Sequence, residues 1–201
     1  MKRAAADMTS LAAHFRVKPE ELEEKTAEMI DACAYFMGGA QWPGKRVKFD
    51  FFYIHCVNCS IFFSVFLEQD WMRVEDKVRL LEWKGRLDVA TYASRGCPEL
   101  RLEEVTGYKA KREWTWEEIV RKVDGMEDDG HVAKLVRALK NGEQRCRPFE
   151  DREGFPIKAD MWLQLGRMAL DSVQDLGESR KWVRNAGFAK AWEDVPDRAN
   201  L

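Results

Sequence analysis

Three residues of this sequence could bind a metal or take part in acid–base chemistry from within helices: His55, Lys84 and His131. Histidine nitrogens are common metal ligands, and a lysine amine becomes a base or a nucleophile when burial removes its charge. The chain has three histidines, and no pattern around the third, His14, indicates a metal site. Because the three candidates are far apart along the chain, the elements that carry them must fold together to form a site.

His55 lies within the longest apolar run of the chain, residues 49–67, FDFFYIHCVNCSIFFSVFL. A run of this length predicts one helix of about five turns, buried on nearly all sides. A polar group there needs a partner, because leaving it unpaired costs about 1–3 kcal/mol. Several side chains recur at steps of three and four and share one face: Phe51, His55, Asn58 or Cys59, and Phe62. His55 is therefore either a core histidine satisfied by a neighbour or a ligand.

Lys84 falls in a second predicted helix, from about Val74 to Ala93. Side chains recur at three- and four-residue steps along the face that we expect to point inward: Leu80, Trp83, Leu87 and Thr91. Lys84 lies within that arc, so it either extends past the apolar face to water or is buried. Burial would lower its pKa and give a neutral amine. Such an amine can act as a base, form a Schiff base, or react with carbon dioxide to give a metal-binding carbamate.

His131 lies in the first turn of a third predicted helix, in which Val132, Leu135 and Leu139 have helical spacing. Asn141 and Gly142 are predicted to end this helix. Asp128 or Asp129 is the natural N-cap, which places His131 in the first turn. The helix dipole there favours neutral imidazole, and a nearby carboxylate can hold the second ring nitrogen, as in many metal sites. The alternative is a histidine that helps to cap the helix.

The rest of the pattern predicts helices and no strands. Further helices are expected over residues 19–37 and 159–176, around Trp182, and over residues 116–126, where Thr115 and Glu118 would form a capping box. Residues 1–18 are predicted to form an irregular N-terminal segment or a short helix. The predicted fold is therefore all-α: one domain, residues 19–201, of about six to seven helices around the buried central helix.

Composition limits the class of function. A net charge of −2, with no basic stripe interleaved with aromatic residues, argues against nucleic-acid binding. Polar residues dilute the apolar run, so a buried helix of a soluble protein is favoured over a membrane span. Five cysteines, and a start without an apolar signal core, lead us to expect free thiols and a cytoplasmic location. Cys56 and Cys59 form a C-x-x-C inside a helix without a second pair, which does not favour redox or zinc chemistry.

Four separated segments, in the right order between Pro19 and Asp197, resemble the C-terminal half of the questin oxidase-like proteins of fungi: DFFYIHCVNCSIFF, LLEWKGRLDVATYASRGCPEL, DDGHVAKLVRAL and WVRNAGFAKAW. The resemblance implies an α-helical oxidoreductase that acts with dioxygen on aromatic polyketides such as anthraquinones. Such enzymes are described as Baeyer–Villiger-like and NADPH-dependent, and at least one as a non-haem iron dioxygenase. On that pattern, His55 and His131 would ligate Fe(II), and Lys84 would be a carbamylated lysine beside them.

The resemblance also implies a departure from the family pattern. Members are about twice as long as this chain, and their N-terminal half supplies further histidine ligands. The expected partners are a small aromatic substrate, dioxygen, and either a second copy in a homodimer or a separate N-terminal half. The tryptophans that could stack on such a substrate are Trp42, Trp71, Trp83 and Trp162. The alternative function is a shortened, non-catalytic helical remnant, or a partner-dependent half of such an enzyme.

Overall fold

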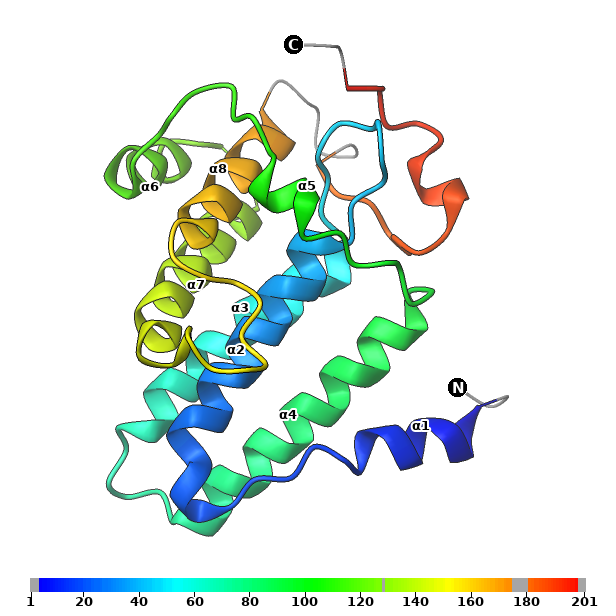
Figure 1. The fold of residues 1–201 in the computed structure, drawn as a ribbon. Helices are drawn as coiled ribbons and strands as arrows, with labels where there is room; N and C mark the ends of the chain where they lie inside the picture. Colours follow the sequence, from blue (N-terminus) through cyan, green and yellow to red (C-terminus); the bar gives the residue numbers. More distant parts are fainter. Residues whose placement is uncertain (1–3, 128, 175–180, 199–201) are drawn as a thin grey trace.

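The computed structural model describes residues 4–127, 129–174 and 181–198, and these residues form one bundle of helices (Figure 1). Short 3-10 helices cover Pro19–Glu21, Arg147–Phe149 and Ala189–Trp192. Within the described ranges there is no strand, only isolated bridges that join Lys45 to Asp197 and Asp50 to Val183. The eight α-helices among these residues are α1 (Ala5–Ala12), α2 (Leu22–Gly39), α3 (Phe51–Leu67), α4 (Val74–Ser94), α5 (Glu103–Thr106), α6 (Trp116–Asp124), α7 (His131–Cys146) and α8 (Met161–Val173).

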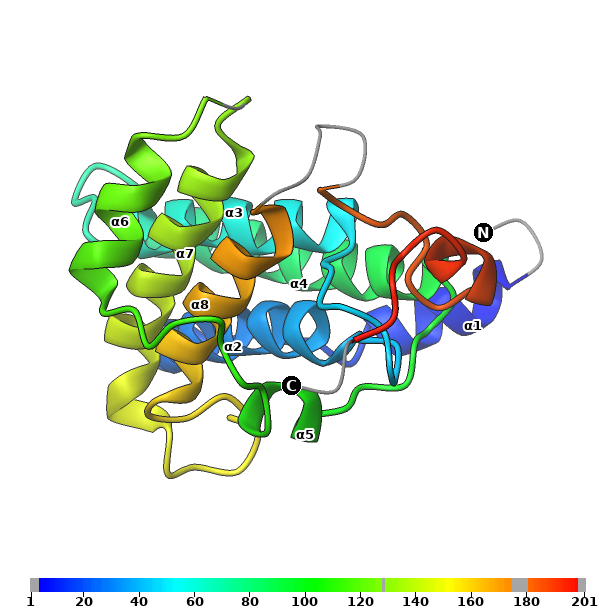
Figure 2. The same cartoon turned by 90° about the horizontal axis from the view of Figure 1, so that it is seen from above.

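The all-α prediction is confirmed, with one short helix beyond the expected set. α1 is the short helix that was one of the two predictions for the N-terminal segment, and the additional helix, α5, forms in the connection after α4. The capping box predicted at the start of α6 is present, because Thr115 and Glu118 exchange hydrogen bonds between side chain and backbone. Figure 2 shows α6, α7 and α8 grouped on one side of the bundle, with α1 at the opposite end.

The predicted central helix, α3, packs against α2, α4 and α7. Its inner side carries Tyr53, Ile54, Val57 and Ser60, each no more than 2% exposed. Burying a large apolar side chain stabilises a fold by about 1.5–3 kcal/mol, so this side of α3 anchors the bundle.

The prediction that α3 is buried on nearly all sides is wrong for one face. The residues exposed on that face are Phe52, His55, Cys59, Phe62 and Val65. An apolar composition does not determine whether every side of a helix has a packing partner. Here the described residues cover only part of the surface of α3. None of the helices within the described residues is both long and apolar enough to cross a membrane.

The start of α3 is fixed by Asp50, which is 1% exposed. One carboxylate oxygen accepts a hydrogen bond from the amide of Phe52 at 2.8 Å, and the other accepts from the amide of Ala186 at 2.9 Å. The backbone of Val183 also pairs with Phe49 and Phe51. The short helix predicted around Trp182 is therefore wrong: the segment is bound to the start of α3 through its backbone groups.

α4 turns a different face inward from the one predicted. Leu81, Lys84 and Asp88 are buried, whereas Trp83 and Leu87 are 52% and 62% exposed. The helical period was predicted correctly and the face was not. Lys84 and Asp88 lie one turn apart and neutralise each other, which allows a polar strip to enter the interior.

α7 continues past Asn141 and Gly142, where the sequence predicted its end, to Cys146. Gly142 serves close packing here, because a Cβ atom at this position would lie 2.4 Å from the side chain of Trp162. Trp162 is 1% exposed, so it is a core residue and cannot present its ring to a substrate.

A buried acid, Asp31 on α2, ties that helix to the loop before α8. Its Oδ1 accepts a hydrogen bond from the amide of Ile157 at 3.2 Å. Burial raises the pKa of Asp31 to about 7, although the amide of Ile157 and the charge of Lys158 act in the opposite direction.

This pKa predicts a pH dependence of folding. The folded-state pKa exceeds the ordinary value of 3.8, so the folded state holds a proton that the unfolded state releases between about pH 4 and 7. The free energy of unfolding should therefore fall as the pH rises through that window, by about 2–4 kcal/mol, and then level off. Urea unfolding from pH 4.5 to 8 measures this, and Asp31→Asn should remove the slope. The exposed-site variant Asp7→Asn should keep it, and a slope that persisted in Asp31→Asn would contradict the assignment.

Candidate metal centre

The imidazoles of His55 and His131 lie side by side, with ring centroids 5.1 Å apart. His55 comes from the first half of α3, and His131 is the first residue of α7. The ring of Phe51 packs against both, with centroid distances of 4.6 Å to His55 and 5.3 Å to His131. The structure thus brings together two of the three predicted site residues.

Each imidazole has an oxygen atom close to its Nδ1 atom. Nδ1 of His55 lies 2.6 Å from the carbonyl oxygen of Phe51, one turn earlier on α3, within hydrogen-bond geometry. Nδ1 of His131 lies 2.6 Å from Oδ1 of Asp129, a close contact whose alignment is not that of a hydrogen bond. A histidine that donates from Nδ1 keeps the lone pair of Nε2, the arrangement found in many metal-binding histidines. The contact with Phe51 favours this arrangement for His55.

Asp129 acts on His131 in two ways. Its carboxylate contacts the ring, and it also accepts a hydrogen bond from the backbone amide of His131 at 3.3 Å. Hydrogen bonding to His131 lowers the pKa of Asp129, which keeps it a carboxylate. The predicted position of His131 in the first turn is confirmed. The predicted aspartate cap is not, because the N-cap is Gly130 at φ 79°; Asp128 lies outside the described residues.

The pair opens toward solvent. His55 is an exposed residue, so the interpretation of a core histidine is wrong, and the His131 side chain is 18% exposed. The guanidinium of Arg184 lies 4.5 Å above the Phe51 ring and places a positive charge beside the pair. Nothing in the sequence indicated this arginine, because it comes from the segment that packs on the start of α3.

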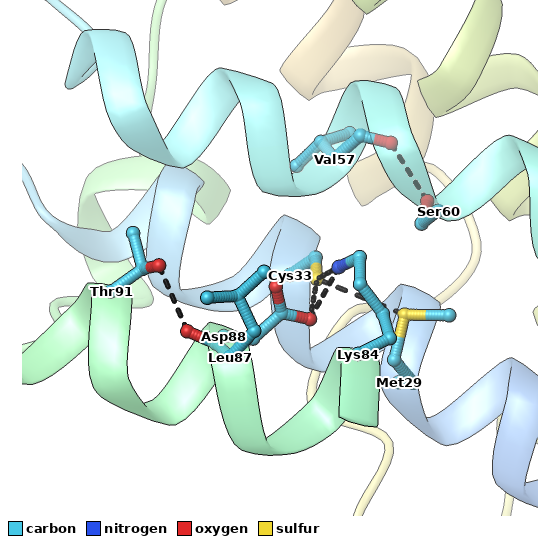
Figure 3. A network of polar contacts seen from close by, with 8 residues as sticks. All are labelled: Met29, Cys33, Val57, Ser60, Lys84, Leu87, Asp88 and Thr91. Atoms are coloured by element: carbon cyan, nitrogen blue, oxygen red, sulfur yellow. Dashed lines mark hydrogen bonds and ion pairs between the residues drawn. The ribbon is translucent and has the colours of Figure 1, made fainter. Parts of the chain in front are cut away.

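Lys84, the third predicted site residue, lies in a buried network between helices (Figure 3). It is 5% exposed, so the interpretation that it extends to water is wrong. Its ammonium donates to the carboxylate of Asp88 and to Sγ of Cys33, which lies 3.4 Å away on α2. The thiol of Cys33 donates to Oδ2 of Asp88 at 3.1 Å. Figure 3 shows the side chains of Lys84 and Asp88 pointing toward Cys33.

This network corrects the expectation of a neutral amine. Burial alone lowers the pKa of Lys84, but the sulfur of Cys33 and the carboxylate of Asp88 raise it, and the net pKa lies above the ordinary value. Lys84 therefore carries a proton. Its four-residue spacing from Asp88 on one helix is a signal that the sequence contained and that was missed. The partner on α2, Cys33, had no such signal.

The described residues hold the two imidazoles and the lysine network as separate clusters of contacts. Among these residues, no group of three or more His, Cys, Asp and Glu side chains is arranged to hold a metal ion. The ligand set of His55, Lys84 and His131 therefore stays a prediction, and the imidazole pair is the part of it that the geometry favours.

An apolar cavity of about 280 Å³ lies between α2 and α4, with Phe15, Phe36, Val89 and Tyr92 in its wall. It is near the lower end of the volumes that hold small ligands. The residues that line it include Asp88 and neither histidine of the pair.

Residues 1–139 match the model of the family described as questin oxidase-like. This chain belongs to that family. The chain is 47% identical over 199 residues to the Baeyer-Villiger oxidase ptaJ of Pestalotiopsis fici. This match covers 96% of the chain and 45% of the relative. It is 45% identical over 197 residues to the questin oxidase of Aspergillus fumigatus, a match that covers 96% of the chain and 44% of that relative. It is 36% identical over 231 residues to the oxidoreductase AflY of Aspergillus parasiticus, a match that covers 100% of the chain and 47% of that relative.

The predicted membership of the questin oxidase-like family is thus confirmed. The chain spans about half the length of the curated relatives that it matches.

The buried ion pair of this chain predicts a specific pattern of stability. Asp88→Asn should lower the free energy of unfolding by about 3–5 kcal/mol, because it leaves the ammonium of Lys84 in the interior without a countercharge. The double variant Lys84→Met/Asp88→Leu should recover most of that loss. Urea unfolding of the single and double variants measures both effects.

A surface pair supplies the matched control. Lys18 and Glu21 form an ion pair at 2.7 Å with side chains 66% and 35% exposed. Glu21→Gln should change the free energy of unfolding far less than Asp88→Asn does, because solvent screens an exposed pair. A loss in Asp88→Asn no larger than in Glu21→Gln would show that Lys84 and Asp88 are not a buried charged pair.

Proposed function

We propose that this chain forms part of an oxidoreductase that acts with dioxygen on flat phenolic polyketides, with a non-haem Fe(II) held by His55 and His131. The observation that carries the proposal is the imidazole pair, with ring centroids 5.1 Å apart and each Nδ1 atom beside an oxygen atom of Phe51 or Asp129. The names of the relatives, Baeyer-Villiger oxidase and questin oxidase, support the class of reaction and substrate.

The residues present fit an iron ion in part. Two imidazoles are typical iron donors, and Fe(II) in such a set, with further positions open, activates dioxygen. The carbonyl of Phe51 and the carboxylate of Asp129 fix the orientation of the two rings. In our proposal the protonated Lys84 is not a ligand: a carbamate would require loss of its proton and of its ion pair with Asp88.

The surroundings suit a flat, acidic aromatic molecule. Phe52 and Phe62 lie on the same exposed face of α3 as His55 and offer apolar surface to a ring system. Arg184 places a cation beside the imidazoles, where it would attract a phenolate oxygen. Of the four tryptophans proposed to stack on the substrate, Trp71 and Trp83 are the ones with large exposed surfaces, 77% and 52%.

The role of NADPH follows from electron balance. Insertion of one oxygen atom beside a ketone, the Baeyer–Villiger reaction, requires two electrons to reduce the second oxygen atom to water. NADPH would supply them. A dioxygenase reaction places both oxygen atoms in the product and requires no NADPH. Dependence of oxygen uptake on NADPH therefore separates the two reaction types.

A second candidate function is a helical unit that does no chemistry by itself. The pairing of Lys84 with Asp88 favours it, because a lysine in such an ion pair would have to leave its partner before it could become a carbamate ligand. Two ligands hold a metal more weakly than the three or four donors of most protein sites.

Metal binding tests the proposed centre without any enzyme assay. Anaerobic titration calorimetry with Fe(II), or absorption with Co(II), should show about one metal ion per chain. His55→Ala and His131→Ala should each abolish metal binding. Asp129→Ala should weaken it about 10- to 100-fold, because the ring of His131 loses the carboxylate that orients it.

His14 gives the matched control, because its Nδ1 contacts the carbonyl of Ser10 on α1, away from the pair. His14→Ala should bind metal as the unchanged chain does. Equal binding by all four variants would exclude the imidazole pair as the metal site.

Oxygen consumption tests the reaction. Iron-loaded protein mixed with a hydroxyanthraquinone should take up dioxygen above the rate of the His55→Ala variant, measured with an oxygen electrode with and without NADPH. If metal binds at the pair and oxygen uptake still equals that of His55→Ala, the non-catalytic alternative is supported.

A further inference from the structure

Exposed apolar side chains concentrate on the α3–α4 hairpin. Ten large hydrophobic residues are exposed among the described residues, and eight of them lie on α3, on α4 or in the turn between them. Those eight are Phe52, Phe62, Val65, Trp71, Val74, Trp83, Leu87 and Val89. Exposed apolar residues scattered singly need no explanation, but a concentration of this kind marks an interaction site.

The exposed residues of the two helices form one face. α2 packs against both α3 and α4, and α3 and α4 pack against each other. The uncovered sides of α3 and α4 therefore both point away from α2. On α3 this side carries Phe52 and Phe62, and on α4 it carries Trp83 and Leu87. We call the surface formed by these four residues the α3–α4 face.

The sequence pattern of the α3–α4 face is typical of a surface that packs against another element. Trp83 and Leu87 belong to the periodic stripe that predicted the inward side of α4, yet the structure exposes both. A stripe at helical spacing is typical of a helix packed against a neighbour. Such a neighbour is missing from the described residues.

The relatives contain polypeptide that could be that neighbour. The Pestalotiopsis fici relative shares 47% identity across 96% of this chain, so it carries the same helices, and more than half of its length lies outside the match. We propose that the α3–α4 face binds the polypeptide that corresponds to this remaining part of a family-length protein, whether it is joined to the chain or separate.

Charge at the border of the face favours this occupant over a second copy of the chain. Arg79 lies 4.5 Å above the ring of Trp83, and Arg95 lies 4.1 Å above the ring of Phe52. A partner with acidic residues around an apolar centre would complement this border, whereas a second copy would bring further arginines to it.

The proposal deepens the proposed function at one point and rests on it there. His55 shares the exposed side of α3 with Phe52 and Phe62, so a unit bound on the α3–α4 face would lie against the imidazole pair. Such a unit could supply the donors that the pair lacks. Docking itself depends on the apolar face and not on the metal.

Co-expression tests the docking proposal. The 201-residue chain, carrying an affinity tag, is produced in the same cells as the part of the Pestalotiopsis fici relative outside the matched region. We expect the two to purify together in a one-to-one complex. Leu87→Glu should lower the amount of complex about tenfold or more, because it places a charge in the apolar interface.

Leu11→Glu is the matched control, because Leu11 on α1 is 59% exposed and Leu87 is 62% exposed. It should leave the complex unchanged, and circular dichroism should show both variants folded. Failure to co-purify, or equal loss in both variants, would overturn the proposal. So would a homodimer of the chain alone, seen by sedimentation, that Leu87→Glu dissolves and Leu11→Glu does not.

The variant His55→Ala separates this proposal from the proposed function. It should still form the complex, because docking depends on the apolar face. A complex that forms normally but binds no iron would overturn the metal proposal and leave the docking proposal standing. Iron bound at the pair by a chain that never forms the complex would overturn the docking proposal and leave the metal proposal standing.

Discussion

The structure depends on one helix whose two sides meet different environments. The inner side of α3 holds α2, α4 and α7 together through side chains that solvent does not reach, such as Ile54 and Val57. Because an α-helix completes a turn every 3.6 residues, the side chains that anchor α3 also fix where His55 points. The position of the imidazole is thus a consequence of core packing. This coupling places a group able to do chemistry on the rigid centre of the bundle rather than on a loop.

Helical period could be read from this sequence, and the choice of face could not. The positions and types of α2, α3, α4 and α6 follow from apolar spacing, capping residues and glycines, all of which are local. Whether Trp83 or Lys84 points inward is decided by partners elsewhere in the chain, such as Cys33 on α2. The end of α7 was missed for the same reason, since Gly142 there meets the ring of Trp162. His55 and His131 were found from residue type, but their proximity is a property of the fold.

The two polar clusters of the protein are stabilised by opposite means. Lys84 and Asp88 are buried, and their mutual attraction and the hydrogen bond from the thiol of Cys33 offset the free-energy cost of removing the two charges from water. This cluster is therefore closed to solvent. His55 and His131 lie nearer to solvent, where the ring of Phe51 packs against both and an oxygen atom lies beside each Nδ1 atom. The closed cluster explains how α4 can pack against α2 despite its charges. The open cluster leaves the pair within reach of solvent, which a binding site requires.

The bond between Asp50 and Ala186 has a consequence for biosynthesis. The two residues are 136 positions apart, so the amide of Ala186 leaves the ribosome well after Asp50 does. The helical hairpin of α3 and α4 can pair while it is being made, since its contacts are local and such contacts form quickly. The amino end of α3, with Phe51 and His55, acquires its second anchor only after the chain has been made as far as Ala186. The imidazole pair is thus completed later than the α3–α4 hairpin in the nascent protein.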